Sequence, residues 1–154
     1  MQKICFVASS GGHLEEISRL SEVRDRYSSF LVTEKTEFTE LNFCEKVYHL
    51  PQINRKEIMF LFKFIWIFIL SYKIMKKENP DCIISTGALA SCPMCFIGKW
   101  KKKKVIYIES FARVDSPSLT GKIMHRFRVA DLFLVQWKEM LEFFPEAVYV
   151  GGIF

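Results

Sequence analysis

The 154-residue chain is long enough for a single domain, residues 1–154, and half of its residues are apolar, which suits a buried core. Its net charge of +5 favours anionic partners, but no RNA- or DNA-binding motif is present, so nucleic acid is not an expected partner. Five cysteines, an odd number, and the lack of a signal-peptide pattern argue against a disulfide-bonded secreted protein and predict a reduced, cytoplasmic setting.

Apolar runs typical of strands alternate with helix-like patterns along the chain. Strands are predicted at residues 4–8, 30–33, 46–50, 82–85, 105–108, 132–135 and 148–150. Helices are predicted at residues 13–26, 58–75, 88–98, 117–129 and 137–144. Because such alternation is typical of a parallel sheet covered by helices, we expect an α/β, Rossmann-like fold with helices on both faces of the sheet.

Two of these helices carry finer expectations. Within residues 13–26 the apolar side chains recur at helical spacing, so the charged ones are expected to point outward: Glu15, Glu16, Arg19 and Arg24. Farther along, Ser116 is followed by Pro117, a pattern typical of an N-cap with proline at the first helical position.

Small residues follow the first predicted strand directly. Residues 9–14, Ser-Ser-Gly-Gly-His-Leu, lie between that strand and a helix, a geometry that points backbone N–H groups and the positive end of a helix dipole at an anion. Ser10, Gly11 and Gly12 are therefore candidate anion-binding residues. His13 is the only nearby side chain that can exchange a proton near neutral pH.

Two later segments also leave the carboxyl ends of predicted strands. Gly87 belongs to a second small-residue turn, at residues 86–91, and Glu109, Ser110 and Arg113 follow the strand at 105–108. Since the carboxyl ends of parallel strands line one edge of a sheet, we expect these residues to share a crevice with the turn at residues 9–14.

Residues 58–75 form the most apolar stretch and are nearly long enough to cross a bilayer. Basic residues flank both ends, and strands before and after the stretch are expected in one sheet, so a crossover helix is favoured over a spanning one. We expect one face on the sheet and the other, including Phe62, Lys63 and Trp66, on a bilayer surface or a partner. The alternative is a wholly buried helix.

Two other patterns each allow two interpretations. The lysine-rich residues 99–104, with Lys101 and Lys102, form either a solvated turn or a contact with anionic lipid headgroups. Cys92 and Cys95 form a Cys-x-x-Cys pattern that is either a redox pair or helix packing; packing is favoured, and no metal site is expected because no second pair lies nearby.

Several local patterns together resemble a known family. They are the residues at 10–13, 80–81, 87, 92–93, 107–114, 119–122 and 133–137. The most specific is the Glu-Ser-Phe-Ala-Arg block at 109–113, followed by the Gly-Lys pair at 121–122 and the Gln-Trp pair at 136–137. The set resembles the acceptor-side, membrane-docking subunit of the two-piece UDP-N-acetylglucosamine transferase of dolichol-linked oligosaccharide synthesis, and its bacterial relatives in capsule and exopolysaccharide synthesis.

The resemblance implies the N-terminal half of a GT-B glycosyltransferase, active only with a second, catalytic subunit. That partner would hold the UDP-sugar, so no cofactor is expected on this chain. This half would bind a lipid-linked saccharide acceptor at the cytoplasmic face of the membrane as a peripheral protein, and contact its partner through Gly152, Ile153 and Phe154. The eukaryotic subunit has an N-terminal membrane anchor that the first residues here do not resemble, which shifts the expected membrane contact to residues 58–75.

For sugar transfer we expect His13 to accept the proton of the attacking hydroxyl, with Glu109 orienting a hydroxyl or serving as the base itself. The anion-binding residues would hold the diphosphate or acceptor: Ser10, Gly11, Gly12, Gly87, Ser110 and Arg113. Two alternatives stay open: His13 holds only the loop, and Glu109 and Arg113 simply pair with each other.

Two rival functions are also open. In the first, the chain is a non-catalytic scaffold that only docks the catalytic partner at the membrane; in the second, it binds a dinucleotide. The second is disfavoured because the turn at residues 9–14 lacks the Gly-x-Gly-x-x-Gly pattern, although Glu34 follows at about the right distance.

Overall fold

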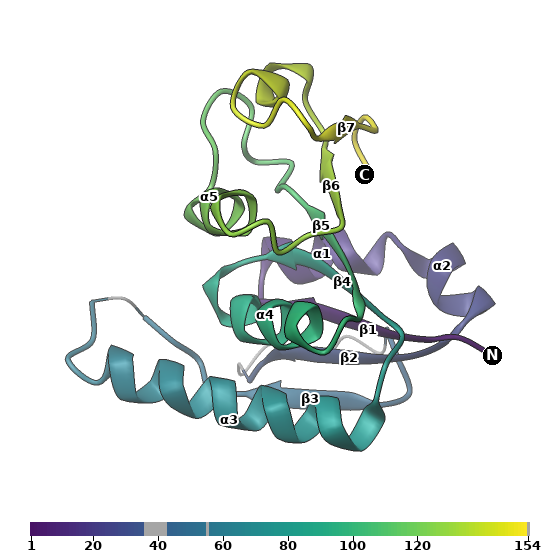
Figure 1. Ribbon diagram of the computed structural model, residues 1–154, viewed down its shortest axis with the longest axis vertical. Coiled ribbons are helices and arrows are strands. Elements are labelled where there is room, and N and C mark those ends of the chain that lie inside the picture. The colour runs from purple at the N-terminus through teal and green to yellow at the C-terminus, as the bar shows by residue number, and fades with distance from the viewer. Residues whose placement is uncertain (36–42, 55, 154) are drawn as a thin grey trace.

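The computed structural model describes residues 1–35, 43–54 and 56–153, and its strands form one parallel sheet in the order β3-β2-β1-β4-β5-β6-β7 (Figure 1). The strands are β1 (Lys3–Ala8), β2 (Ser28–Glu34), β3 (Val47–Leu50), β4 (Cys82–Gly87), β5 (Lys104–Ile108), β6 (Leu132–Val135) and β7 (Val148–Tyr149). The direction of strand addition reverses between β1 and β4, so the predicted Rossmann-like topology is confirmed.

Helices cover both faces of this sheet, because successive strand residues point to opposite sides. The helices are α1 (Gly12–Ser18), α2 (Ser21–Arg26), α3 (Phe60–Glu78), α4 (Cys92–Trp100) and α5 (Leu119–Arg126), with 3₁₀ turns η1 (Leu89–Ser91) and η2 (Lys138–Glu142). On one face α3, α4 and α5 pack over strand residues that include Val7 and Ile83. On the other, Leu14 and Ile17 of α1 pack over Phe6 and its neighbours.

The predicted helix at residues 13–26 is two short helices. α1 ends where the amides of Arg19 and Leu20 bond to carbonyls only three residues back, a tighter 3₁₀ turn, and α2 then begins at Ser21. Leu20 and Val23 still pack against the core, so the apolar periodicity is real although the helix is divided. The outward placement of Glu16 is wrong, because this side chain is buried.

Two predictions near the C-terminus also differ from the structure. The N-cap of α5 is Ser118 rather than Ser116: the Ser118 Oγ accepts a hydrogen bond from the Gly121 amide at 2.8 Å. Pro117 therefore precedes the cap instead of opening the helix. The amphipathic helix predicted at residues 137–144 is the short 3₁₀ turn η2.

The long apolar helix α3 connects β3 to β4 within one sheet, which confirms the crossover interpretation. It ends at Asn79, which adopts a left-handed conformation (φ 43°) next to Pro80. Ile67, Ser71 and Met75 are buried on one side of α3, while Phe62, Ile65 and Trp66 are exposed on the other, so the helix is not wholly buried. Within the described part of the chain, no helix combines the length and apolar character needed to cross a membrane.

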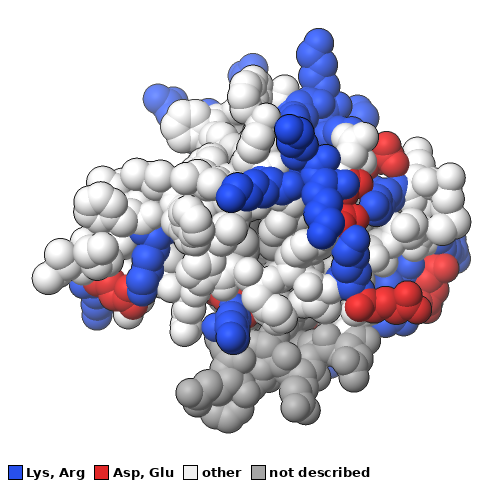
Figure 2. All heavy atoms as spheres, turned by 90° about the horizontal axis from the view of Figure 1, so that it is seen from below, with Lys and Arg blue, Asp and Glu red and all other residues white. Residues whose placement is uncertain are grey.

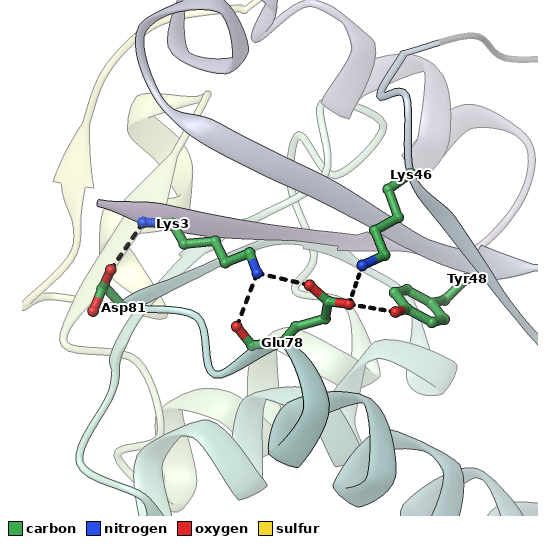
Figure 3. A network of polar contacts seen from close by, with 5 residues as sticks. All are labelled: Lys3, Lys46, Tyr48, Glu78 and Asp81. Carbon is green, nitrogen blue, oxygen red and sulfur yellow. Dashed lines mark hydrogen bonds and ion pairs between the residues drawn. The ribbon is translucent and has the colours of Figure 1, made fainter. Parts of the chain in front are cut away.

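At the end of α3, the buried Glu78 carboxylate links this helix to two strands of the sheet, β1 and β3 (Figure 3). Its Oε2 pairs with Lys3 Nζ of β1 at 2.7 Å, and its Oε1 contacts the Tyr48 hydroxyl of β3 and Nζ of Lys46, which directly precedes β3. Burial raises the pKa of Glu78, but the hydrogen bonds from Lys3, Lys46 and Tyr48 outweigh burial and lower the pKa to about 2. Asp81 accepts a further bond from the Lys3 amide at 2.8 Å.

Glu78→Gln is expected to lower the free energy of unfolding by about 2–3 kcal/mol at pH 7. Because the folded pKa lies below the ordinary value of 4.5, this contribution is complete above pH 4.5 and is lost as the pH falls toward about 2. Urea unfolding across this pH range should therefore show that the free energies of unfolding of the wild type and of Glu78→Gln become equal in acid. Glu57→Gln, which removes an exposed ion pair to Lys63, is the control and should change stability far less. An equal loss in both variants would contradict the assignment.

Candidate functional site

The two small-residue turns meet where the strand order reverses. The Ser9 amide donates to the Gly87 carbonyl at 2.9 Å, and the Ala88 amide donates to Ser9 Oγ at 3.2 Å. Gly11 has a φ of +81°, which favours glycine, and both Gly11 and Gly12 are exposed with open space around them. Ser10, beside them, is half-buried. The expected juxtaposition of the β1 and β4 turns is thus observed.

The ring of His13 lies directly against Gly87. A Cβ built on Gly87, whose φ is +103°, would sit 3.2 Å from Cε1 and 3.3 Å from Nδ1 of His13. The Thr86 hydroxyl donates to the His13 carbonyl at 2.7 Å and fixes the first turn of α1 against β4. The absence of a side chain at Gly87 therefore leaves the space that the imidazole occupies.

The environment of His13 favours the neutral imidazole. Burial lowers its pKa below the ordinary 6.5, the nearby charge of Arg113 lowers it further, and the backbone of Thr86 acts in the opposite direction. Nδ1 is buried and lacks a hydrogen-bond partner of good geometry among the described residues. A neutral imidazole at pH 7 is able to accept a proton.

The pKa of His13, followed by NMR of the imidazole, is expected to lie below 6.5 in the folded chain. Arg113→Gln should raise it, since removing a nearby positive charge relieves the cost of protonation. Arg128→Gln, at an exposed position beyond α5, is the control and should leave it unchanged. A His13 pKa at or above 6.5, or no response to Arg113→Gln, would contradict this account of the site.

Glu109 is almost completely buried, with 1 % of its surface exposed, at the end of β5. Its Oε1 accepts from the Ser110 amide at 3.2 Å, and its Oε2 lies so close to α5 that a Cβ on Gly121 would be 1.7 Å away. Burial raises the pKa of Glu109, while Ser118, the Ser110 amide and Arg113 oppose this shift. The described ion pairs include none between Glu109 and the exposed Arg113.

Glu16, missed by sequence reasoning, organises the segment after β5. Its Oε1 accepts from the Ser110 hydroxyl at 2.8 Å and from the Phe111 amide at 3.1 Å, and its Oε2 accepts from Gln136 Nε2 at 3.4 Å. Ser110, a candidate acceptor-binding residue, therefore directs its hydroxyl into the protein. The sequence contains one indication that Glu16 lies near the site: it follows His13 by three residues, which places both side chains on the same face of a helix.

The C-terminal residues return to this cluster. The Ile153 amide donates to Gln136 Oε1 at 3.0 Å, while Gln136 Nε2 also donates to the Glu109 carbonyl at 3.0 Å. A Cβ on Gly152 would lie 3.0 Å from the Phe111 ring, so this segment passes close to the 109–113 block. Phe154, a candidate partner contact, lies outside the described residues.

A groove of about 480 Å³ lies on the α2 side of the sheet. Its apolar lining includes Ile84, Ile106, Ile108, Leu132 and Leu134 of β4, β5 and β6. Ile106, Leu134 and Ile153 pack at the edge of the same core cluster. The sheet therefore carries an open apolar surface on this face, and Ile153 packs against the same core cluster as two of its lining residues.

The candidate membrane residues lie on the far side of the sheet, on and after α3 and α4. Phe62 and Trp66 are exposed, Lys63 pairs with Glu57, and Lys101 Nζ lies 5.1 Å from the centre of the Tyr72 ring. Lys102 is exposed, with a φ of 57°. Seen from below in Figure 2, the surface over the first part of α3 is largely uncharged, and Lys and Arg side chains gather over its later part.

Cys92 and Cys95 are buried free thiols at the start of α4, where they pack in the core, as the packing interpretation predicts. Burial raises the pKa of Cys95 well above that of an ordinary thiol, which disfavours the reactive thiolate.

Comparison with known proteins identifies relatives over nearly the whole chain. The model of the family "Oligosaccharide biosynthesis protein Alg14 like" matches residues 4–153. The UDP-N-acetylglucosamine transferase subunit ALG14 of Mus musculus is 29 % identical over 98 % of this chain and 82 % of its own length, and that of Homo sapiens is 30 % identical over 97 % and 82 %.

Solved structures share the fold at low sequence identity. MurG of Acinetobacter baumannii has a TM-score of 0.70 at 14 % identity, covering 90 % of this chain and 43 % of that one. UDP-N-acetylglucosamine 2-epimerase of Rickettsia bellii has a TM-score of 0.76 at 14 % identity, covering 99 % and 45 %. The chain thus spans less than half the length of these two solved chains and has the Rossmann-like architecture of one half of a GT-B protein. By the family match over residues 4–153, the chain belongs to the Alg14-like family of oligosaccharide biosynthesis proteins.

Proposed function

We propose that this chain is the acceptor-side subunit of a two-component glycosyltransferase of polysaccharide or capsule synthesis. A separate partner chain holds a UDP-sugar, and this chain presents a lipid-diphosphate-linked acceptor to it. The observation that carries the proposal is the match of 98 % of the chain to a relative described as a transferase subunit. The open apolar groove on β4–β6 and the adjacent C-terminal residues offer a surface for the partner.

We infer that His13 is the catalytic base. As an acceptor hydroxyl attacks the anomeric carbon, a C–O bond forms, the bond to the UDP leaving group breaks, and the hydroxyl proton passes to the imidazole. The lowered pKa keeps His13 unprotonated and ready for this step. Glu109 is the weaker candidate, because its carboxylate is enclosed against α5 and 1 % of its surface is exposed.

The acceptor diphosphate is proposed to bind at the same edge of the sheet. The exposed Gly11 and Gly12 allow a phosphate to approach the backbone closely, and the exposed Arg113 guanidinium provides a bidentate donor. Ser110 is better assigned to positioning, since its hydroxyl bonds to Glu16 and supports the segment that carries Arg113.

The proposed function includes peripheral docking on the cytoplasmic face of the membrane. Its support is the exposed apolar side of α3, with Phe62, Ile65 and Trp66, beside the cluster of lysines near the end of α4. Aromatic side chains at the level of the headgroups and lysines near anionic lipids are both favourable.

Reconstitution tests the proposal. The chain is co-purified with a candidate UDP-sugar-binding partner chain from the same organism and incubated with membranes, a lipid-diphosphate-linked saccharide and a panel of UDP-sugars. Sugar transfer should require both chains, and neither alone should turn over. Transfer by the partner alone would reduce this chain to a scaffold, and no transfer with any donor in a verified complex would contradict the proposal.

A further inference from the structure

An apolar groove of about 660 Å³ runs between α3 and α4, within the size range of small-molecule sites. Its walls are Phe68, Ile69 and Tyr72 of α3 and Phe96, Ile97 and Trp100 of α4. The Tyr72 and Trp100 rings, 6.5 Å apart, stand at the boundary between the two helices. The shape and lining suit an apolar chain rather than a polar ligand.

The charged residues that line this groove are lysines. Lys73 and Lys76 line it, and Lys101 lies over the Tyr72 ring. Within the described residues none of these three lysines has a carboxylate partner, whereas the nearby Lys63 and Lys99 pair with Glu57 and Asp131. Apolar walls with an uncompensated cationic rim are complementary to a molecule that has an anionic head and an apolar tail.

The groove also continues the exposed apolar side of α3. Ile65 is 50 % exposed and Ile69 is 42 % exposed one turn later, so the surface proposed to meet the bilayer leads into the groove. Trp100, 76 % exposed at the end of α4, borders it at the other side. A lipid in the membrane leaflet that faces the docked protein would therefore need to move only a short way to enter the groove.

We propose that this groove binds one anionic phospholipid of the bilayer, with an acyl chain between α3 and α4 and the phosphate at Lys73 and Lys76. The inference rests on the proposed membrane docking and deepens it: docking is then selective for anionic lipid through a defined site and not through diffuse charge alone. Each methylene placed in the groove and each lysine at the headgroup adds to the affinity.

The test uses the full chain and dihexanoyl-phosphatidylglycerol below its micelle concentration, so that binding to single lipids is measured without a bilayer. Intrinsic tryptophan fluorescence reports binding, because Trp100 borders the groove. We expect saturable binding that is at least tenfold tighter than for dihexanoyl-phosphatidylcholine, and about tenfold weaker in Lys73→Gln/Lys76→Gln. Lys77→Gln/Lys103→Gln, which removes two lysines outside the groove, should keep the affinity.

A matched pair of substitutions separates the groove from the docking surface. Ile69→Glu places a carboxylate in the groove and should abolish binding of the single lipid. Ile65→Glu places the same charge one turn away, on the exposed side of α3 outside the groove, and should leave that binding intact. Both should weaken sedimentation with phosphatidylglycerol vesicles, and because both positions are exposed, circular dichroism should show both variants folded.

Each other outcome is decisive. Vesicle binding without saturable binding of the single lipid would overturn the groove site and leave membrane docking standing. If the wild-type chain binds neither the vesicles nor the single lipid, membrane docking is contradicted as well. Equal affinity for the two headgroups, or equal loss in Ile65→Glu and Ile69→Glu, would overturn the assignment. Tighter binding of farnesyl phosphate than of phosphatidylglycerol would assign the groove to the polyprenyl acceptor, and a protein seated there in the purified complex would assign it to the partner.

Discussion

His13→Ala is expected to lower turnover of the assembled two-chain enzyme by about 10²–10⁴-fold while leaving assembly unchanged, the range typical of removing a general base. The substitution removes an imidazole that burial and the charge of Arg113 keep neutral. The pH profile should lose its acidic limb, since in the wild type activity falls as His13 becomes protonated. Turnover of the lipid-linked acceptor at saturating UDP-sugar is the measurement.

The control for this prediction is His49→Ala, which removes an exposed histidine from β3 on the outer edge of the sheet. It should not change turnover. Full activity of His13→Ala in a normally assembled complex would remove the catalytic assignment and support the scaffold function. Loss of assembly in His13→Ala would instead mean that the ring serves to pack the two turns together at Gly87.

The sheet and the position of the site follow from local patterns in the sequence. Each strand is an apolar run, and the rule that parallel strands end at one edge is enough to bring the turns at Gly11 and Gly87 together. The contact of His13 with Gly87 needs no more than this rule and the small residue at position 87. The long apolar stretch at residues 58–75 is equally informative. Because the strands before and after it belong to one sheet, it is interpreted as a helix that connects them over one face of the sheet and not as a helix that spans a membrane.

Local sequence patterns do not place the polar side chains of the site, because the partners of these side chains are distant in the sequence. Glu16 bonds to Ser110 and Gln136, which lie 94 and 120 residues farther along the chain. A charged residue on an amphipathic helix is usually solvent-exposed, so periodicity alone assigns Glu16 to the surface. Only the fold shows that β5 and β6 place three hydrogen-bond donors opposite it.

The start of α5 illustrates a different limit. Ser116 and Ser118 are both suitable caps, and local sequence favours Ser116 because a proline follows it. The structure selects Ser118, whose hydroxyl bonds to the Gly121 amide, and it places Gly121 against the Glu109 carboxylate. A long-range packing contact therefore decides between two local signals of similar strength.

Glu16→Ala is expected to lower the free energy of unfolding by about 3–5 kcal/mol, because it leaves the buried donors of Ser110, Phe111 and Gln136 without their acceptor. The same change frees the segment that carries Arg113, so any turnover that remains should show a raised KM for the acceptor. Urea unfolding and acceptor titrations in the assembled complex measure the two effects.

Two further substitutions make the prediction specific. Glu16→Gln keeps an oxygen for Ser110 and Phe111 but places an amide N–H₂ opposite the N–H₂ of Gln136, so we expect an intermediate loss of about 1–3 kcal/mol. Rotation of the Gln136 amide cannot remove this clash of donors, because the amide already donates to the Glu109 carbonyl and accepts from the Ile153 amide.

Glu15→Ala, at the exposed neighbouring position, is the control and should lower the free energy of unfolding only slightly. If Glu16→Ala were as mild as Glu15→Ala, the buried carboxylate would not be what holds the 109–113 segment to α1.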